Sequence, residues 1–161
     1  LLHTLGSIHT YFRLGNKFVV GVRWKAVVSS KGLLSNYTST LIQAPAFTPT
    51  PHSKTIFNPA FRSTQYLAAG VIPIWKILNN LQFRNEFYVF APFRQIYEGE
   101  NMVPYYGKAF TKYHFMGESS LVLDLSFASI SLYANYYDYP ARNWNFGINI
   151  GLLVFSPKFL E

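Results

Sequence analysis

The chain contains no cysteine, carries little charge and lacks a long uninterrupted apolar run. Without cysteine it can form neither disulfides nor thiolate metal sites. Only 13% of its 161 residues are charged, about half the usual fraction in soluble domains. No stretch has the roughly 20 mainly apolar residues of a transmembrane helix, and the uncharged run 32–51 is rich in Ser, Thr and Pro instead. A disulfide scaffold and a helical membrane protein are therefore not expected.

The net charge is +7, which indicates an anionic neighbour such as lipid headgroups or nucleic acid. The basic residues are scattered, however, and no Lys/Arg-rich stripe of a nucleic-acid interface is present. We therefore expect no nucleic-acid partner. The opening LLHTLGSIHT lacks the basic start and cleavage site of a signal peptide. The chain also opens without methionine, and we expect it to be a segment of a longer protein.

Aromatic residues make up 19% of the chain, and its dominant hydrophobic period is two. In KFVVGVRWKAVV, apolar side chains occupy every second position from Phe18 to Val28, while Arg23 and Lys25 lie on the opposite face. Similar alternation predicts seven strands, with a bulge at Pro73 in the third. The predicted strands are residues 6–13, 17–28, 65–76, 81–93, 112–125, 129–137 and 144–155.

The connections between these strands alternate in length. Short turns fall near residues 14–16, 79–80 and 126, whereas longer connections span 30–64, 94–109 and 139–143. Antiparallel hairpins with short turns at one end and long loops at the other are typical of outer-membrane barrels. We therefore predict an all-β, antiparallel transmembrane β-barrel with a long in-folded extracellular loop. An odd strand number and an open edge do not suit lipid, so residues 1–161 are expected to form one barrel segment that lacks upstream strands, or to hide an eighth strand in the long loop.

A soluble β-sandwich also alternates, but three features favour a membrane. Several predicted strands have 11 to 14 residues, whereas soluble strands cluster at about 5 to 6. No charge interrupts the apolar faces, and only Asn85 is polar there. Large aromatic residues near one end could form an interfacial girdle, namely Trp24, Tyr136 and Trp144. The opposite face would line a lumen with Arg23, Lys25, Arg84, Lys112, His114 and Asp124.

No complete catalytic site can be recognised in the sequence. The segment MGESSL, residues 116–121, has the wrong spacing for a nucleophile elbow, and the four histidines lack metal-ligand spacing. Glu86, Glu118 and Asp124 are interpreted as solvated or salt-bridged lumen carboxylates. We expect no catalytic activity, metal or cofactor in this chain.

Several segments resemble the bacterial surface-antigen barrels of the outer-membrane assembly-factor superfamily. AFRST, residues 60–64, stands where that family has an arginine motif at the tip of a loop that folds back into the lumen, and YLAAG, residues 66–70, resembles the strand that follows. ESSLVLDLSFASISLYANY and NWNFGINIGLLVF are similar to the penultimate hairpin and the closing strand. The resemblance implies that Arg62 pairs with lumen carboxylates, for which Glu86 and Glu118 are the candidates, and that loop 30–64 forms a latch or plug.

The loop NYTSTLIQAPAFTPTPHSKTIFNPAFRS looks most similar to the C-terminal barrel of patatin-like phospholipases from Bacteroidetes-type outer membranes. That resemblance implies a lipid hydrolase upstream, which this segment would anchor or help deliver in the bacterial outer membrane. Expected partners are outer-membrane lipid, lipopolysaccharide, the upstream part of the same barrel and the outer-membrane assembly machinery. Two other functions stay open: a self-standing small porin or adhesin barrel, and a soluble β-sandwich that binds lipid or carbohydrate.

Overall fold

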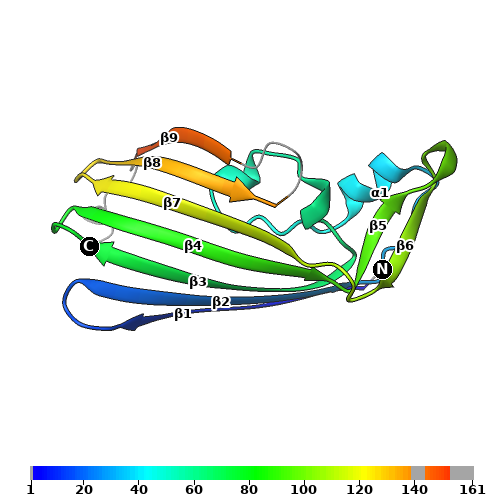
Figure 1. The fold of residues 1–161 in the computed structure, drawn as a ribbon, viewed down its shortest axis with the longest axis horizontal. Helices are drawn as coiled ribbons and strands as arrows, with labels where there is room; N and C mark the ends of the chain where they lie inside the picture. Colours follow the sequence, from blue (N-terminus) through cyan, green and yellow to red (C-terminus); the bar gives the residue numbers. More distant parts are fainter. Residues whose placement is uncertain (1, 139–143, 153–161) are drawn as a thin grey trace, which may run out of the picture.

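The computed structural model describes residues 2–138 and 144–152, and its main element is one seven-stranded antiparallel sheet (Figure 1). The strands lie in the order β1-β2-β3-β4-β7-β8-β9. Their bounds are β1 His3–Arg13, β2 Phe18–Ser29, β3 Gln65–Lys76, β4 Leu81–Pro92, β7 His114–Asp124, β8 Ala128–Tyr137 and β9 Trp144–Leu152. The chain is all-β, and each of the seven predicted strands is present. Predicted residues 153–155, the connection 139–143 and the tail fall outside the described residues.

The second long connection contains a hairpin that the alternation did not predict. β5 (Arg94–Glu98) and β6 (Pro104–Ala109) pair with each other in a separate two-stranded sheet, with the short turn η3 (Glu100–Met102) between them. Figure 1 shows this hairpin projecting from the end of the main sheet opposite the short turns. The interpretation of 94–109 as a loop without strands was therefore wrong, because strands of five and six residues are too short to show a clear period.

The predicted bulge at Pro73 is also wrong. β2 and β3 pair without a shift through Val20 and Pro73. On the other side, pairing between β3 and β4 is interrupted at Ile72 and Pro73 but resumes with Ile74 opposite Arg84 in the same register. Proline lacks the N–H that a ladder hydrogen bond needs, and this structure accommodates the loss by skipping pairs rather than by inserting a residue.

The alternation separates the two faces of the sheet as predicted. In β4, Phe83, Phe87 and Val89 are exposed on one face, which we call the outward face. Glu86 and Tyr88, which alternate with them, are buried on the opposite, inward face. Asn85 is the polar exception on the outward face of β4, and Ser119 lies opposite it on β7, where its hydroxyl donates a hydrogen bond of 2.7 Å to the Asn85 amide oxygen. Cross-strand pairing thus satisfies this polar group locally.

Residues 30–64, which we call the plug loop, pack against the inward face. The loop contains the helix α1 (Tyr37–Gln43) and the short turns η1 (His52–Lys54) and η2 (Pro59–Phe61). Phe47, which is 2% exposed, contacts the rings of Tyr66, Tyr88 and Phe90. The main core cluster therefore forms between strand and loop side chains rather than between two sheets.

A smaller core connects the plug loop to the hairpin. Leu41 and Ala44, at the end of α1, pack with Ile96 of β5, and Tyr106 of β6 lies against this cluster. Asn36 caps the start of α1, and its side chain accepts a hydrogen bond from the Ser39 backbone N–H. The loop is thus held at both the sheet and the hairpin.

Among the described strands, β1 and β9 form the two edges of the sheet and do not pair with each other. Every residue of β1 is exposed. The described residues therefore form an open sheet whose inward face is covered over its central strands and exposed at β1. Within residues 2–138 and 144–152, no helix is long and apolar enough to cross a membrane.

Replacing Phe47 with Ala should release the plug loop from the sheet. Truncating a buried Phe typically costs about 3 to 5 kcal/mol, and the Phe47 ring fills the centre of the strand–loop core. We expect faster proteolytic cleavage within residues 30–64, measured by limited proteolysis and mass spectrometry. Ile42→Ala, at a loop position that is 65% exposed, is the matched control. Equal cleavage in both variants would contradict the packing role of Phe47.

Candidate functional site: a loop held on a polar sheet face

The inward face carries a buried ionic cluster at the centre of β4. Arg84 and Glu86 form an ion pair with 2.7 Å between Nε and Oε1. The Tyr88 hydroxyl donates a hydrogen bond to the other carboxylate oxygen of Glu86. The Tyr88 ring lies over Gly70 of β3, where an added Cβ would approach the ring to 2.1 Å. Glycine at position 70 therefore makes room for the ring that orients Glu86.

Glu118 of β7 lies directly opposite Glu86 in the strand register. The two residues are only 6% and 3% exposed, so a pair of carboxylates is buried between sheet and loop. Thr50 of the plug loop lies beside Glu118, and the next strand adds Asn135, which is 1% exposed. Burial of charged and amide groups is expensive without polar neighbours, and Thr50 is a polar neighbour that the loop supplies to Glu118.

The structure corrects the expected partners of Arg62. Its guanidinium donates hydrogen bonds to the carbonyl oxygens of Leu41 (3.1 Å) and Ala44 (3.3 Å), at the end of α1. It also lies over the Phe57 ring, 4.5 Å from the centroid. The expected pairing of Arg62 with Glu86 and Glu118 is therefore wrong: Glu86 pairs with Arg84. Arg62 satisfies helix carbonyls that lack intrahelical partners and so closes the loop on itself.

Other contacts hold the loop on the sheet. Arg23 of β2 donates to the Pro49 carbonyl oxygen at 3.3 Å, and the Tyr66 hydroxyl of β3 donates to that of Ala46 at 3.2 Å. His52 Nδ1 lies 3.0 Å from the Tyr137 hydroxyl of β8. Three strands thus bind residues 46–52, which we call the docked segment. The sequence did not predict this segment, because two of its contacts are made by backbone carbonyl groups, which every residue has. The prolines of the segment were visible in the sequence but did not identify the contacts.

The remaining predicted lumen residues divide between the two ends of the inward face. Lys25 is half-buried, with its amine 5.8 Å from the Tyr66 ring centroid. At the short-turn end, Asp124 accepts hydrogen bonds from Gln82 and Ser129. At the loop end, His114 contacts Asp138 and Gln95. Lys112 precedes β7 and is exposed, so the predicted strand there was two residues too long at its start.

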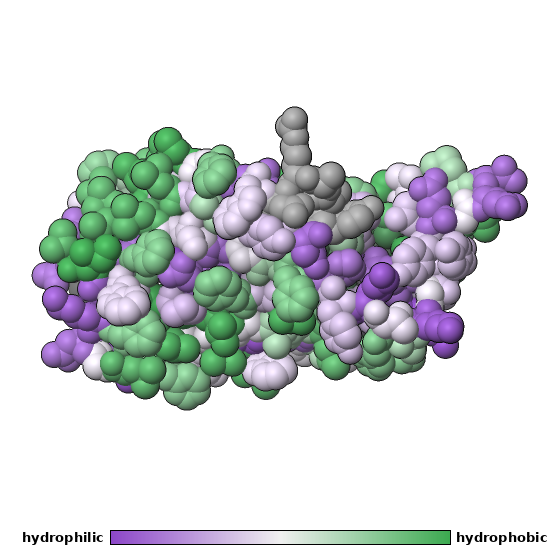
Figure 2. All heavy atoms as spheres, viewed as in Figure 1, coloured by the Kyte–Doolittle hydropathy of each residue, from purple (hydrophilic) through white to green (hydrophobic). Residues whose placement is uncertain are grey.

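The outward face is apolar and exposed across the sheet. In Figure 2, hydrophobic residues gather over the strands, and hydrophilic ones are more frequent toward the hairpin end. Large outward side chains that are at least 37% exposed occur on all seven strands. The set includes Ile8, Phe12, Trp24, Val28, Leu67, Val71, Trp75, Phe83, Phe87, Val89, Phe115, Leu121, Leu132, Trp144, Phe146, Ile148, Ile150 and Leu152.

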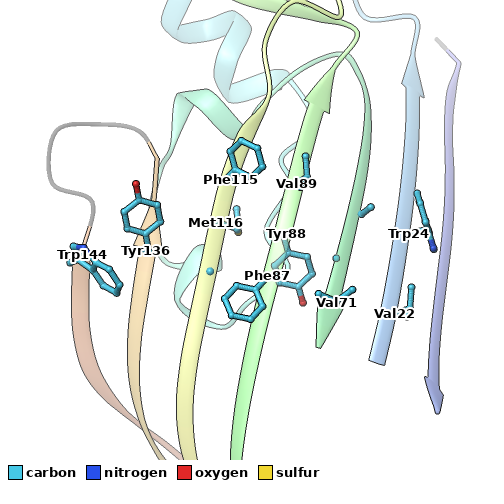
Figure 3. A pocket seen from close by; sticks show the side chains of 13 residues that line it. Val22, Trp24, Val71, Phe87, Tyr88, Val89, Phe115, Met116, Tyr136 and Trp144 are labelled. Carbon is cyan, nitrogen blue, oxygen red and sulfur yellow. The ribbon is translucent and has the colours of Figure 1, made fainter. Parts of the chain in front are cut away.

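The three predicted girdle residues are all on this face and line one shallow hollow of about 530 Å³. Figure 3 shows Trp24 at one side and Tyr136 with Trp144 at the other, while Phe87 and Phe115 lie between them. Tyr136 and Trp144 are neighbours in register, with ring centroids 5.1 Å apart. The hollow lies in the loop-side half of the strands, where a girdle was expected.

The described residues thus combine an exposed apolar surface with a polar face that the plug loop partly covers. Among the residues that the structure describes, no group of three or more His, Asp or Glu side chains could hold a metal ion. A scan against protein-family models finds no match, and no curated protein or solved structure matches the chain. The function must therefore be inferred from the residues and their geometry.

Replacing Arg62 with Ala should loosen α1 within the plug loop. The loss of charge-assisted hydrogen bonds to helix carbonyls should favour local opening by about 1 to 2 kcal/mol, since the guanidinium is partly exposed. Limited proteolysis of residues 30–64 would measure the change, with Lys54→Ala at an exposed position of the same loop as control.

A double-mutant cycle of Arg62→Ala with Glu118→Gln tests the corrected pairing. Residues without shared contacts give nearly additive effects, within about 0.5 kcal/mol. A coupling energy above about 1 kcal/mol would restore the direct Arg62–carboxylate latch.

Acidification should weaken docking of the loop through His52. Burial lowers the pKa of this imidazole from its ordinary value of 6.5, so the docked loop binds fewer protons than the open loop below that pH. The His52 contribution is therefore fully present above about pH 6.5 and is lost as the pH falls toward the lowered pKa. Loop cleavage, measured from about pH 7.5 to pH 5, should rise more in the wild type than in His52→Gln. Parallel profiles would refute the contribution of His52.

Proposed function

We propose that this chain is a segment of an outer-membrane β-barrel of the surface-antigen type, with the plug loop docked in the barrel interior. Its partners would be outer-membrane lipid and lipopolysaccharide on the outward face, and further strands of the same barrel at the sheet edges. The outer-membrane assembly machinery would insert it. The proposal places the protein in the bacterial outer membrane.

The observation that carries this proposal is the inverted distribution of side chains. The outward face exposes Trp24, which is 59% exposed, and Phe87, which is 52% exposed, while Glu86 and Glu118 are buried on the inward face. Soluble proteins rarely expose contiguous apolar patches of more than a few hundred Å². A soluble β-sandwich would bury this face against a second sheet, and within residues 2–138 and 144–152 the hairpin β5–β6 is the only other sheet. Lipid would provide the missing apolar environment.

The strand lengths suit the same environment. The seven strands of the main sheet have 9 to 12 residues each. A transmembrane β-strand needs about 9 to 11 residues when tilted by about 45°. Trp144, which is exposed at the loop end of β9, would suit the aromatic belt of such barrels.

The two sheet edges explain why further strands are part of the proposal. An open edge cannot face lipid, because its unpaired N–H and C=O groups would lack partners. Both β1 and β9 have such an edge among the described residues. Pairing of these edges with other strands would close the barrel.

The link to a patatin-like lipid hydrolase rests on sequence resemblance alone. In this proposal the segment anchors or helps deliver an attached hydrolase, and it contributes no catalytic group itself. Docking of residues 46–52 across β2, β3 and β8 favours a closed interior over an open pore.

The first test is partitioning between buffer and detergent, combined with gel mobility before and after heating. This chain and a version extended upstream are compared. We expect both to require detergent, and only the extended form to run as a compact, heat-modifiable band. Solubility without detergent would contradict the membrane proposal, whereas heat-modifiability of the short chain would indicate a self-standing small barrel.

A lysine in place of Val71 provides a residue-level test. Val71 lies near the middle of β3 on the outward face and is 47% exposed. A Lys at the bilayer midplane costs about 2 to 4 kcal/mol, so Val71→Lys should lower the unfolding free energy in lipid vesicles by that amount. Leu34→Lys, at an exposed apolar position of the plug loop, should change it by less than about 0.5 kcal/mol. Equal effects of the two substitutions would show that Val71 does not face lipid.

A further inference from the structure

A second hollow lies at the loop end of the molecule, where α1, η2, β5 and the residues before β7 meet. It has a volume of about 190 Å³, and we call it the hairpin pocket. The aromatic and polar side chains that line it are Tyr37, Gln95, Tyr97, Lys112 and His114. The outward hollow is almost entirely apolar, whereas this one combines aromatic rings with an amide, an ammonium and an imidazole. A few convergent polar groups among apolar walls are typical of ligand sites.

One wall of the hairpin pocket is a fixed aromatic ring. Tyr97 of β5 stacks on Tyr105 of β6, with 5.6 Å between ring centroids and 27° between ring planes. The same ring lies close to Gly107, where an added Cβ would come within 2.6 Å of it. Ile96, the preceding residue, is 1% exposed and packs against α1 in the smaller core. The ring is therefore in place before any ligand arrives.

The polar side of the pocket is also organised in advance. His114 lies between two partners, with Nδ1 3.5 Å from an oxygen of Asp138 and Nε2 3.3 Å from the side-chain oxygen of Gln95. Of these two contacts, the one between Nε2 and Gln95 is a hydrogen bond, and it holds Gln95, which is 8% exposed, at the pocket wall.

Lys112 supplies the charge. It is exposed, and neither of the two ion pairs found among the described residues involves it. Glu98 and Glu100 lie at the far tip of the hairpin, beyond Tyr97. The ammonium is therefore available to a ligand anion at the pocket mouth.

We propose that the hairpin pocket binds a single sugar-acid residue. The apolar C–H face of a pyranose ring would pack on Tyr97, its hydroxyls would hydrogen-bond to Gln95, and its carboxylate would form a charge-assisted bond with Lys112. The hollow of about 190 Å³ has room for one pyranose ring. The pocket is built by the plug loop and the hairpin, so this inference goes beyond the proposed membrane function and does not depend on it.

Calorimetric titration of the folded full chain tests the ligand class. The probes are galacturonate, galactose and inorganic phosphate, each titrated separately. Galacturonate should bind about tenfold or more tightly than either of the others, because only it has both ring and carboxylate. Absence of galacturonate binding would overturn the proposal. Equal binding of galactose would overturn the role of the carboxylate, and equal binding of phosphate would overturn that of the ring.

Two pairs of matched variants then test the residues. Lys112→Gln should weaken galacturonate binding about tenfold, while Lys108→Gln, at an exposed lysine outside the pocket, should not. Tyr97→Leu should weaken binding similarly. Tyr105→Leu removes the same ring stack, but Tyr105 does not line the pocket, so this variant should bind galacturonate as the wild type does. Loop cleavage rates at the wild-type value would show that each variant is folded. Equal weakening within either pair would assign the effect to hairpin stability and overturn the site.

Titration with and without detergent separates this inference from the membrane proposal. Binding by a chain that proves soluble would support the hairpin pocket even though the barrel proposal had failed. A detergent-folded chain that does not bind galacturonate would overturn the pocket and leave the barrel proposal standing.

Discussion

The two-residue period of the strands is the constraint on which the rest of the structure depends. It sends alternate side chains to opposite faces, so a strand that exposes Phe87 and Val89 must direct Glu86 and Tyr88 to the other side. Because no second sheet packs against the main sheet among the described residues, each of its faces must contact something else. Residues 30–64 cover the central part of the polar face, and the apolar face is exposed. An unusual assignment follows, in which the polar side of the sheet is the protein interior.

That interior is stabilised by two kinds of contact that depend on each other. Phe47 fills an apolar site among Tyr66, Tyr88 and Phe90, which positions the neighbouring backbone over the charged strands. Arg23 and His52 then form polar contacts across the same boundary. If the aromatic packing were lost, Glu86 and Glu118 would become hydrated and the loop would lose its packing contacts with the sheet. Buried polar networks are sensitive in this way, because an unpaired buried group costs more than a paired one contributes.

The two hollows of the molecule differ in chemistry because they lie on different parts of this design. The hollow between Trp24 and Trp144 is bounded by outward side chains of the sheet and is apolar. The hairpin pocket is built by elements that lie beyond the sheet, where alternation no longer dictates the lining and Gln95, Tyr97 and Lys112 can converge. An apolar hollow and a hollow with polar lining therefore coexist in one short chain.

The sequence alone determined the all-β class, the seven strands of the main sheet and the face on which Arg23, Lys25, Arg84 and His114 lie, because hydrophobic alternation is a local property of each strand. It also placed Glu86 and Glu118 on one face, and the register brings them opposite each other. The partner of Arg62, the docked segment 46–52 and the hairpin β5–β6 were decided only by the tertiary structure. Arg62 binds backbone carbonyls about twenty residues away, and a carbonyl is present at every residue. The sequence could show that an arginine ended the loop, but which oxygens it reached depended on how the loop folded.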